Sequence, residues 1–270
     1  MNIDTDSGTD SDGSDDSDAS APALNSVWTR PPRRQKEQLT RERIVAEAVA
    51  LLDEEGVEAL SMRTLGQRLG AGATSLYRHV ASKDELIELV TDEVYGELEV
   101  PEITDPASWR LALHVNAHSL REVGLRHMWL THVLGQVGLN YLGPNVVSVT
   151  QRSLAVLTTA GFDMHEAARA MSTVSSYVIG ITSAEAGWLS ALRRRGMSEQ
   201  DWYRTVGPKM ATVADDAGLA EIYREELKKD PMETRLGNFV YGLDLILDSL
   251  EIRLAAKLAA DAKARAAASQ

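Results

Sequence analysis

The strongest constraint on the fold is the pattern of short helices predicted over residues 61–85, SMRTLGQRLGAGATSLYRHVASKDE. Ser61 is a predicted helix cap, and apolar residues follow it at the spacings of three and four that mark one helical face. Gly70 and Gly72 supply backbone freedom where the chain must turn. The helix predicted next, over residues 74–80, is too short to be stable alone. The segment therefore predicts a helix-turn-helix unit supported by a core.

The second of these helices has two different faces. Leu76 and Val80 are spaced to face the supporting core. The side chains left on the outward side are small and polar at first, then aromatic and cationic: Thr74, Ser75, Tyr77, Arg78 and His79. A supported helix with such a face suits the major groove of DNA. On this pattern alone a helical hairpin in an all-α domain remains the alternative, since short helix-turn-helix spacings occur in many folds.

A supporting helix is predicted just before this unit. Thr40 is its predicted N-cap, and Leu39 and Ile44 are placed for a hydrophobic staple. An apolar stripe then continues to a glycine, Gly56. With the capping box at Ser82 and Glu85, which begins the next helix, these features predict a compact three-helix DNA-binding unit.

These motifs carry a family resemblance. Residues 39–90 resemble the N-terminal domain of the TetR (tetracycline-repressor) family of bacterial transcription regulators. The matching positions are Gly56, Leu60-Ser61-Met62-Arg63, Leu69-Gly70, Leu76-Tyr77-Arg78-His79 and Lys83. The segment from Trp109 to Leu254 resembles, more weakly, the larger domain of the tetracycline-repressor branch. The resemblance implies an operator-binding homodimer with a ligand-binding domain.

The resemblance also implies which residues contact DNA: Arg63, Ala73, Thr74, Ser75, Tyr77, Arg78, His79 and Lys83. The guanidinium fork of Arg78 suits guanine O6 and N7, whereas Tyr77, His79 and Lys83 suit phosphates. Ala73 stands where the tetracycline repressor has a longer polar side chain, so we expect a different operator.

Composition and charge place the remaining boundaries. The chain of 270 residues has no Cys and no apolar run long enough to span a bilayer, which predicts a cytoplasmic protein. Glycine and proline lie mostly between helical patterns, so we expect an all-α fold. The net charge of the chain is −12. Residues 1–24 contribute seven Asp to it and no Lys or Arg. The predicted segments are a disordered acidic tail with a basic linker (1–38), the DNA-binding domain (39–98), a ligand-binding and dimerisation domain (99–255) and a frayed tail (256–270).

A homodimer interface is predicted on two helices. Between Leu236 and Leu254 apolar residues recur at spacings of three and four, and residues 167–184 form a second candidate helix. The predicted interface residues are Val174, Val178, Leu243, Leu247, Leu250 and Leu254. The alternative is that these stripes pack on the core of their own chain.

The predicted ligand site lies between Trp109 and Trp188. The resemblance places Asn116, Leu120 and His132 near the ligand, and Trp129, Ser176 and Tyr177 are further candidates, with ordinary core packing as the alternative for each. The acidic residue that helps hold a drug-bound metal in the tetracycline repressor falls at Ala184, one place before Glu185. We therefore expect a small, largely apolar effector in place of a tetracycline–metal complex.

The sequence gives little support for a metal site or an enzyme active site. His114 and His118 have a spacing that can hold a metal, yet no third ligand is indicated, so no metal or other cofactor is expected. Phosphate-loop and nucleophile-elbow motifs are absent from the sequence, so we do not expect an enzyme. The prediction is a ligand-released repressor. The alternative is a constitutive DNA-binding regulator or activator whose second domain only dimerises or binds a partner.

Overall fold

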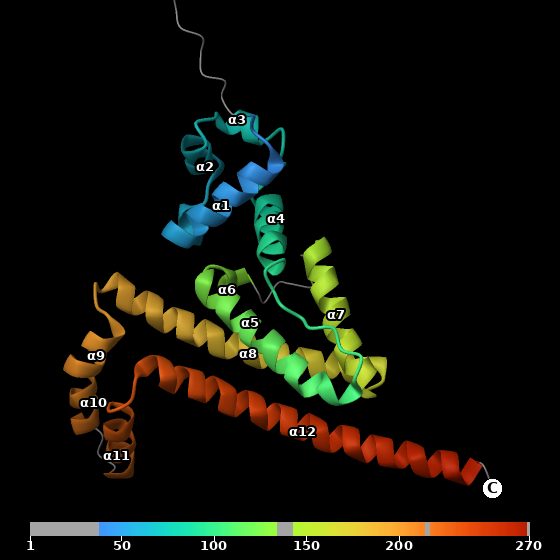
Figure 1. Ribbon diagram of the computed structural model, residues 1–270. Helices are drawn as coiled ribbons and strands as arrows, with labels where there is room; N and C mark the ends of the chain where they lie inside the picture. The colour runs from blue at the N-terminus through green and yellow to red at the C-terminus, as the bar shows by residue number, and fades with distance from the viewer. Residues whose placement is uncertain (1–37, 134–142, 214–216, 269–270) are drawn as a thin grey trace, which may run out of the picture. The chain divides into compact units, whose positions relative to one another are not determined.

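The computed structural model of the chain describes residues 38–133, 143–213 and 217–268. The predicted acidic tail and its basic segment fall outside these ranges. Within them every regular element is a helix, as Figure 1 shows, and the predicted all-α class is confirmed. None of the helices in these ranges is both long enough and apolar enough to cross a bilayer.

The DNA-binding domain begins with capped helices, as predicted. Thr40 Oγ1 accepts from the Arg43 amide at 3.2 Å, and Ser61 Oγ accepts from the Thr64 amide at 3.0 Å. Ser82 likewise accepts from the Glu85 amide, but the Glu85 carboxylate accepts from the Ala81 amide and not from that of Ser82, so the predicted capping box is only half formed. The helices are α1 (Arg41–Glu55), α2 (Met62–Arg68), α3 (Ala73–Leu76) and α4 (Lys83–Tyr95), with a 3-10 turn, η1 (Val57–Ala59), after α1.

The regular part of α3 is shorter than the predicted helix over residues 74–80. Beyond Leu76 the chain continues in hydrogen-bonded turns, with the Val80 amide donating to the Leu76 carbonyl at 3.0 Å. A helix of this length is held by tertiary packing because it has too few internal hydrogen bonds to be stable alone.

The larger domain is built around three long helices. These are α5 (Trp109–Arg126), α8 (Met164–Arg194) and α12 (Pro231–Ala268), and Figure 1 shows α8 and α12 side by side. A capping box between Asp163 and Glu166 begins α8. The other elements are η2 (Pro106–Ser108), α6 (Leu130–Val133), α7 (Pro144–Ala160), α9 (Glu199–Thr205), α10 (Gly207–Val213) and α11 (Ala217–Glu226).

The end of α12 covers most of the segment predicted to fray. The helix continues to Ala268, although Leu254 is its last buried residue and Lys257 its last half-buried one. Alanine, lysine and arginine favour helix strongly, so the backbone stays helical where little packing supports it.

The contact between α8 and α12 depends on a small residue. A Cβ at Gly242 would lie 2.2 Å from the Tyr177 hydroxyl oxygen, so the ring of Tyr177 fits only over glycine. Its hydroxyl donates to the main-chain carbonyls of Asn238 and Phe239, and burial raises the pKa of Tyr177.

Candidate DNA-binding and effector sites

The predicted DNA-contacting side chains share one property, which is exposure. Leu76 and Val80 are buried, so they anchor α3 and turn its other side chains to solvent. Tyr77 is 53% exposed, which is high for an aromatic residue and requires an explanation other than packing. The exposed members of the predicted set are Arg63, Thr74, Ser75, Tyr77, Arg78, His79 and Lys83, while Ala73 is half-buried.

The turn between α2 and α3 depends on two glycines, of which the sequence pattern identified one. Gly70 has φ +60°, in the left-handed region that favours glycine. Gly72, in contrast, is extended at φ −74°. The residue overlooked is Gly66, where a Cβ would lie 2.8 Å from the Ala71 carbonyl oxygen. Gly66 therefore permits the close approach of α2 to the start of α3.

Ion pairs within the DNA-binding domain leave positive charge on its exposed side. Arg68 joins α2 to α1 through Glu47 and Glu54, with 2.6 Å to each carboxylate. In the ranges that the structure describes, no ion pair engages Arg63, Arg78 or Lys83. Such cations are available for phosphate and base contacts.

Besides Glu97, which pairs with Arg126 of α5, two carboxylates on the helices of this domain connect it to the larger one. Asp92 of α4 accepts from the main-chain amides of Asn145 and Val146 at 2.9 and 3.0 Å, and so caps the start of α7. Gly143 makes this approach possible, because a Cβ there would lie 2.2 Å from the Asp92 carboxylate.

The second carboxylate is Asp53, near the end of α1. Its Oδ1 accepts from Trp129 Nε1 at 2.8 Å and lies 2.8 Å from His127 Nδ1. Trp129 is only 3% exposed. Trp129, predicted as an apolar wall of the ligand site, therefore packs at the junction with the DNA-binding domain.

The other predicted ligand residues are dispersed. Asn116 Nδ2 donates to the Glu99 carbonyl at 3.1 Å, and Leu120 packs against the core. His132 and Ser176 are exposed on α6 and α8, and Tyr177 is engaged with α12. Thus the described structure does not gather these six residues around one cavity.

Glu185 is occupied by two arginines. Its carboxylate accepts from Arg121 through two bonds of 2.9 and 2.7 Å, and from Arg235 at 2.6 Å. Arg235 also pairs with Glu199 of α9, and Arg121 lies over the Phe239 ring. This buried network joins α5, α8, α9 and α12, and it leaves Glu185 unavailable as a metal ligand.

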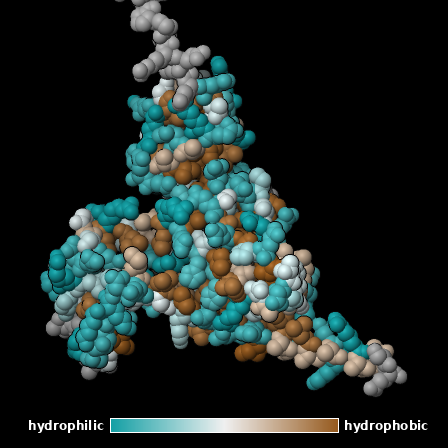
Figure 2. Space-filling model, in the orientation of Figure 1, coloured by the Kyte–Doolittle hydropathy of each residue, from teal (hydrophilic) through white to brown (hydrophobic). Residues whose placement is uncertain are grey.

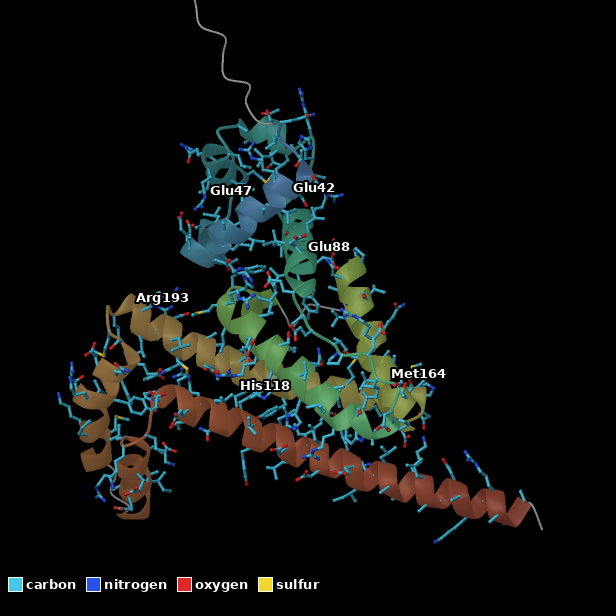
Figure 3. The ribbon with its side chains drawn as sticks, in the orientation of Figure 1. Glu42, Glu47, Glu88, His118, Met164 and Arg193 are labelled. Carbon is cyan, nitrogen blue, oxygen red and sulfur yellow. The ribbon has the colours of Figure 1, made fainter. Side chains whose placement is uncertain are left out.

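A hollow of about 500 Å³ lies along α5 and the segment that follows α4. Its lining is more polar than the expected apolar site, because Glu97, Glu99, Glu122 and Arg126 contribute to it. His118, labelled in Figure 3, also lines it, and burial lowers its pKa. In the described residues no group of three or more His, Asp or Glu side chains gathers as a metal site.

Most of the predicted dimer-interface residues are buried within the single chain. Val174, Val178, Leu243, Leu247 and Leu254 are buried within their own chain, and Leu250 is half-buried. This burial supports the alternative in which these residues pack on the core of their own chain. Large apolar side chains that do reach the surface of α12 include Tyr241, Leu245 and Ile252, and Figure 2 shows hydrophobic residues along this helix.

A helix-turn-helix unit with an exposed α3 followed by exposed cationic residues, attached to a larger helical domain, defines a DNA-binding transcription regulator. Residues 44–90 match the family model "Bacterial regulatory proteins, tetR family", and residues 101–254 match "Tetracyclin repressor-like, C-terminal domain". The chain belongs to the TetR family, which confirms the predicted resemblance in both domains.

Similar proteins agree. The HTH-type transcriptional repressor DrrR1 of Streptomyces coeruleorubidus is 32% identical over 238 residues, which is 87% of each chain. An HTH-type transcriptional regulator of Saccharopolyspora erythraea is 42% identical over 168 residues, 62% of this chain and 70% of that protein. The crystal structure of Streptomyces coelicolor ActR in complex with actinorhodin aligns with a TM-score of 0.64 at 30% identity, covering 79% of this chain and 96% of ActR.

Proposed function

We propose that the chain is a repressor that binds a palindromic operator as a homodimer and is released by a small-molecule effector. The observation that carries DNA reading is the segment formed by α3 and the turns after it, in which Leu76 and Val80 are buried while Tyr77, Arg78 and His79 are exposed. The repressor function of DrrR1, with 32% identity over most of both chains, supports the direction of regulation.

The operator can be identified without knowing the regulated genes. The full chain is mixed with a library of random DNA duplexes, bound duplexes are recovered through repeated rounds, and the selected sequences are aligned. We expect an inverted repeat whose half-sites are centred about 34–36 Å apart, one helical turn, or a multiple of it. Recovery of unrelated sequences, or of a single half-site, would contradict the proposal.

For the homodimer, the supporting surface is the side of α8 and α12 that faces away from the core. On α8 this side carries small exposed residues at helical spacing: Ser172, Ser176, Gly180, Ala184 and Gly187. On α12 it carries Tyr241, Leu245 and Ile252, the last two 52% and 71% exposed. Small residues on one helix allow large residues of another to approach closely, so a second copy of the chain is the proposed occupant.

A groove along the same two helices strengthens this assignment. It has a volume of about 580 Å³, and Thr173, Leu245 and Ser249 are among its lining residues. Packing of α8 and α12 against their copies would form an intersubunit four-helix bundle and cover the groove.

The proposed effector is a small, largely apolar molecule that binds along α5, with Asn116 as its polar anchor. Asn116 carries both a donor and an acceptor, and its amide already reaches the Glu99 carbonyl beside the hollow. The ActR complex with actinorhodin supports a small-molecule ligand for a chain of this fold.

One observation favours the alternative of a constitutive regulator. The six predicted ligand residues do not line one cavity within the described ranges, since Trp129 and Tyr177 are engaged in helix contacts. Screening compounds for release of the selected duplex separates the two functions, because a constitutive regulator would retain the duplex throughout.

A further inference from the structure

We propose that Asp53 is a positioning residue for operator binding, which fixes the orientation of the DNA-binding domain through His127 and Trp129. This inference rests on the proposed function, because its consequence is measured as operator affinity. Asp53 lies on α1, and its carboxylate reaches His127 and Trp129 of the larger domain. It does not belong to the predicted DNA-contacting set.

The geometry joins three elements at one carboxylate. Asp53 Oδ1 is 2.8 Å from both Trp129 Nε1 and His127 Nδ1. These two residues flank Met128 at the junction between α5 and α6. His127 Nε2 in turn lies 3.3 Å from Glu97, just after α4. We call Asp53, His127, Trp129 and Glu97 the Asp53 cluster.

Burial makes the contact costly to lose. His127 and Trp129 are 4% and 3% exposed, so water cannot readily replace a missing acceptor. The Trp129 indole N–H is a donor only, and Asp53 is the acceptor that it reaches. Removing the carboxylate would leave a buried donor unsatisfied, and the junction would have to rearrange to expose it.

The Asp53 cluster and Asp92 attach the DNA-binding domain to the larger domain through different helices, α1 and α4. Asp92 connects α4 to the start of α7, and α4 is also the covalent route into the larger domain. A domain attached through one helix can still rock about that helix. Asp53 adds an attachment on α1, and two attachments on different helices fix an orientation that one cannot.

A fixed orientation matters because both copies of α3 must reach their half-sites together. If the DNA-binding domain of each copy can rotate relative to its larger domain, that motion is lost when DNA binds. The lost conformational entropy then weakens operator binding. The DNA contacts themselves remain intact. A positioning residue should therefore change affinity without changing the number of phosphates contacted, and so without changing the salt dependence.

The test uses the full chain and the duplex that it selects from the random library. Asp53→Ala should weaken binding by about tenfold or more, with the slope of log affinity against log salt unchanged. Asp53→Asn keeps an acceptor for the Trp129 N–H and should stay within about threefold of the wild type. Glu54→Ala is the matched control, because Glu54 is the adjacent acid on α1 and, among the residues that the structure describes, pairs with Arg68 inside the DNA-binding domain. It should also stay within about threefold.

Two further measurements guard against a merely structural effect. The indole N–H resonance of Trp129, assigned by its loss in Trp129→Phe, should be slow to exchange in the wild type and in Asp53→Asn, and fast in Asp53→Ala. Should Asp53→Ala fail to fold, Trp129→Phe supplies the affinity measurement, since it keeps a ring but removes the N–H. If both single variants fold, the double variant Asp53→Ala/Trp129→Phe should bind the duplex no more weakly than Asp53→Ala alone. The reason is that each substitution removes the same contact, between Asp53 and the Trp129 N–H.

Unchanged affinity in a folded Asp53→Ala, or equal losses in Asp53→Ala and Glu54→Ala, would overturn the inference. A reduced salt slope would also overturn it, since Asp53 would then be affecting phosphate contacts. These results differ from failure of the proposed function, in which the wild-type chain would select no duplex.

Discussion

Arg78 and Lys83 are both exposed and both belong to the predicted DNA-contacting set, yet their chemistry predicts different roles. Arg78→Ala should relax preference at one operator position by about 1–3 kcal/mol, because the guanidinium fork reads guanine. Lys83→Ala should weaken all duplexes alike and lower the salt slope by about 1, because the ammonium group contacts phosphate. Competition binding against single-base operator variants distinguishes the two, and an unchanged specificity profile for Arg78→Ala would contradict its assignment.

Glu185 leads to a prediction about stability. Glu185→Ala would leave Arg121 and Arg235 close together without the carboxylate that joins them. Removing one partner from a buried ion pair costs about 3–5 kcal/mol, so we expect a loss of this size in the free energy of unfolding, measured with urea. Glu225→Ala is the control, since its pair with Lys228 is exposed, and it should show no measurable change. Equal effects of the two substitutions would show that the network does not stabilise the fold.

For single residues, the sequence predicts which side chains point inward or outward better than it predicts which side chains contact each other. The spacing of Leu76 and Val80 was enough to place them inward and Arg78 outward, because helical period alone decides the face. The partner of Trp129 could not be predicted, since it is Asp53, 76 residues earlier in the chain. Gly66 was missed for the same reason, because its close neighbour is a backbone atom that no residue pattern reveals.

Among the elements, α12 shows why an apolar stripe is ambiguous. Its sequence carries two apolar sides, one with Leu243 and Leu247 and the other with Leu245 and Ile252. A helix that packs against its own chain on one side and against another surface on the other carries an apolar stripe on each side. The sequence pattern does not say which of the two stripes packs within the chain. The structure resolves this by burying Leu243 and Leu247 completely.

The proposed dimer surface is tested by filling it without disturbing the chain. A Cβ at Gly180 meets nothing within 4 Å, so Gly180→Leu should fold normally yet obstruct a partner helix. Leu245→Asp should bury an unpaired charge in the same interface. Sedimentation should show dissociation for both, with collapse of operator affinity because a monomer contacts one half-site.

The matched control for this surface is Leu111→Asp. Leu111 is 68% exposed on α5 and lines the hollow along that helix, not the groove along α8 and α12, and so the substitution should leave the dimer intact. Intact dimers in both Gly180→Leu and Leu245→Asp would show that the chain associates through another surface.

For the whole molecule, the prediction of two domains rested on one strong motif and one weak likeness, and the contacts between the domains had no sequence signal. Asp92 and Asp53 look like ordinary exposed acids in an amphipathic helix pattern. Their roles depend on where α7 and the α5–α6 junction lie in space. Long-range polar contacts of this kind follow from the assembled fold, so helical period cannot predict them.

The effector switch is the last prediction. An effector can release the operator only by binding more tightly to the state in which the two copies of α3 are wrongly spaced. A hundredfold loss of operator affinity requires a coupling of about 2.7 kcal/mol. With an inducer found by screening against the selected duplex, Asn116→Ala should weaken inducer binding while leaving operator affinity in the absence of inducer unchanged. Gln151→Ala, an exposed polar residue on α7, is the control and should leave both affinities unchanged. If Asn116→Ala and Gln151→Ala bind the inducer equally well, Asn116 is not the anchor and the effector binds elsewhere.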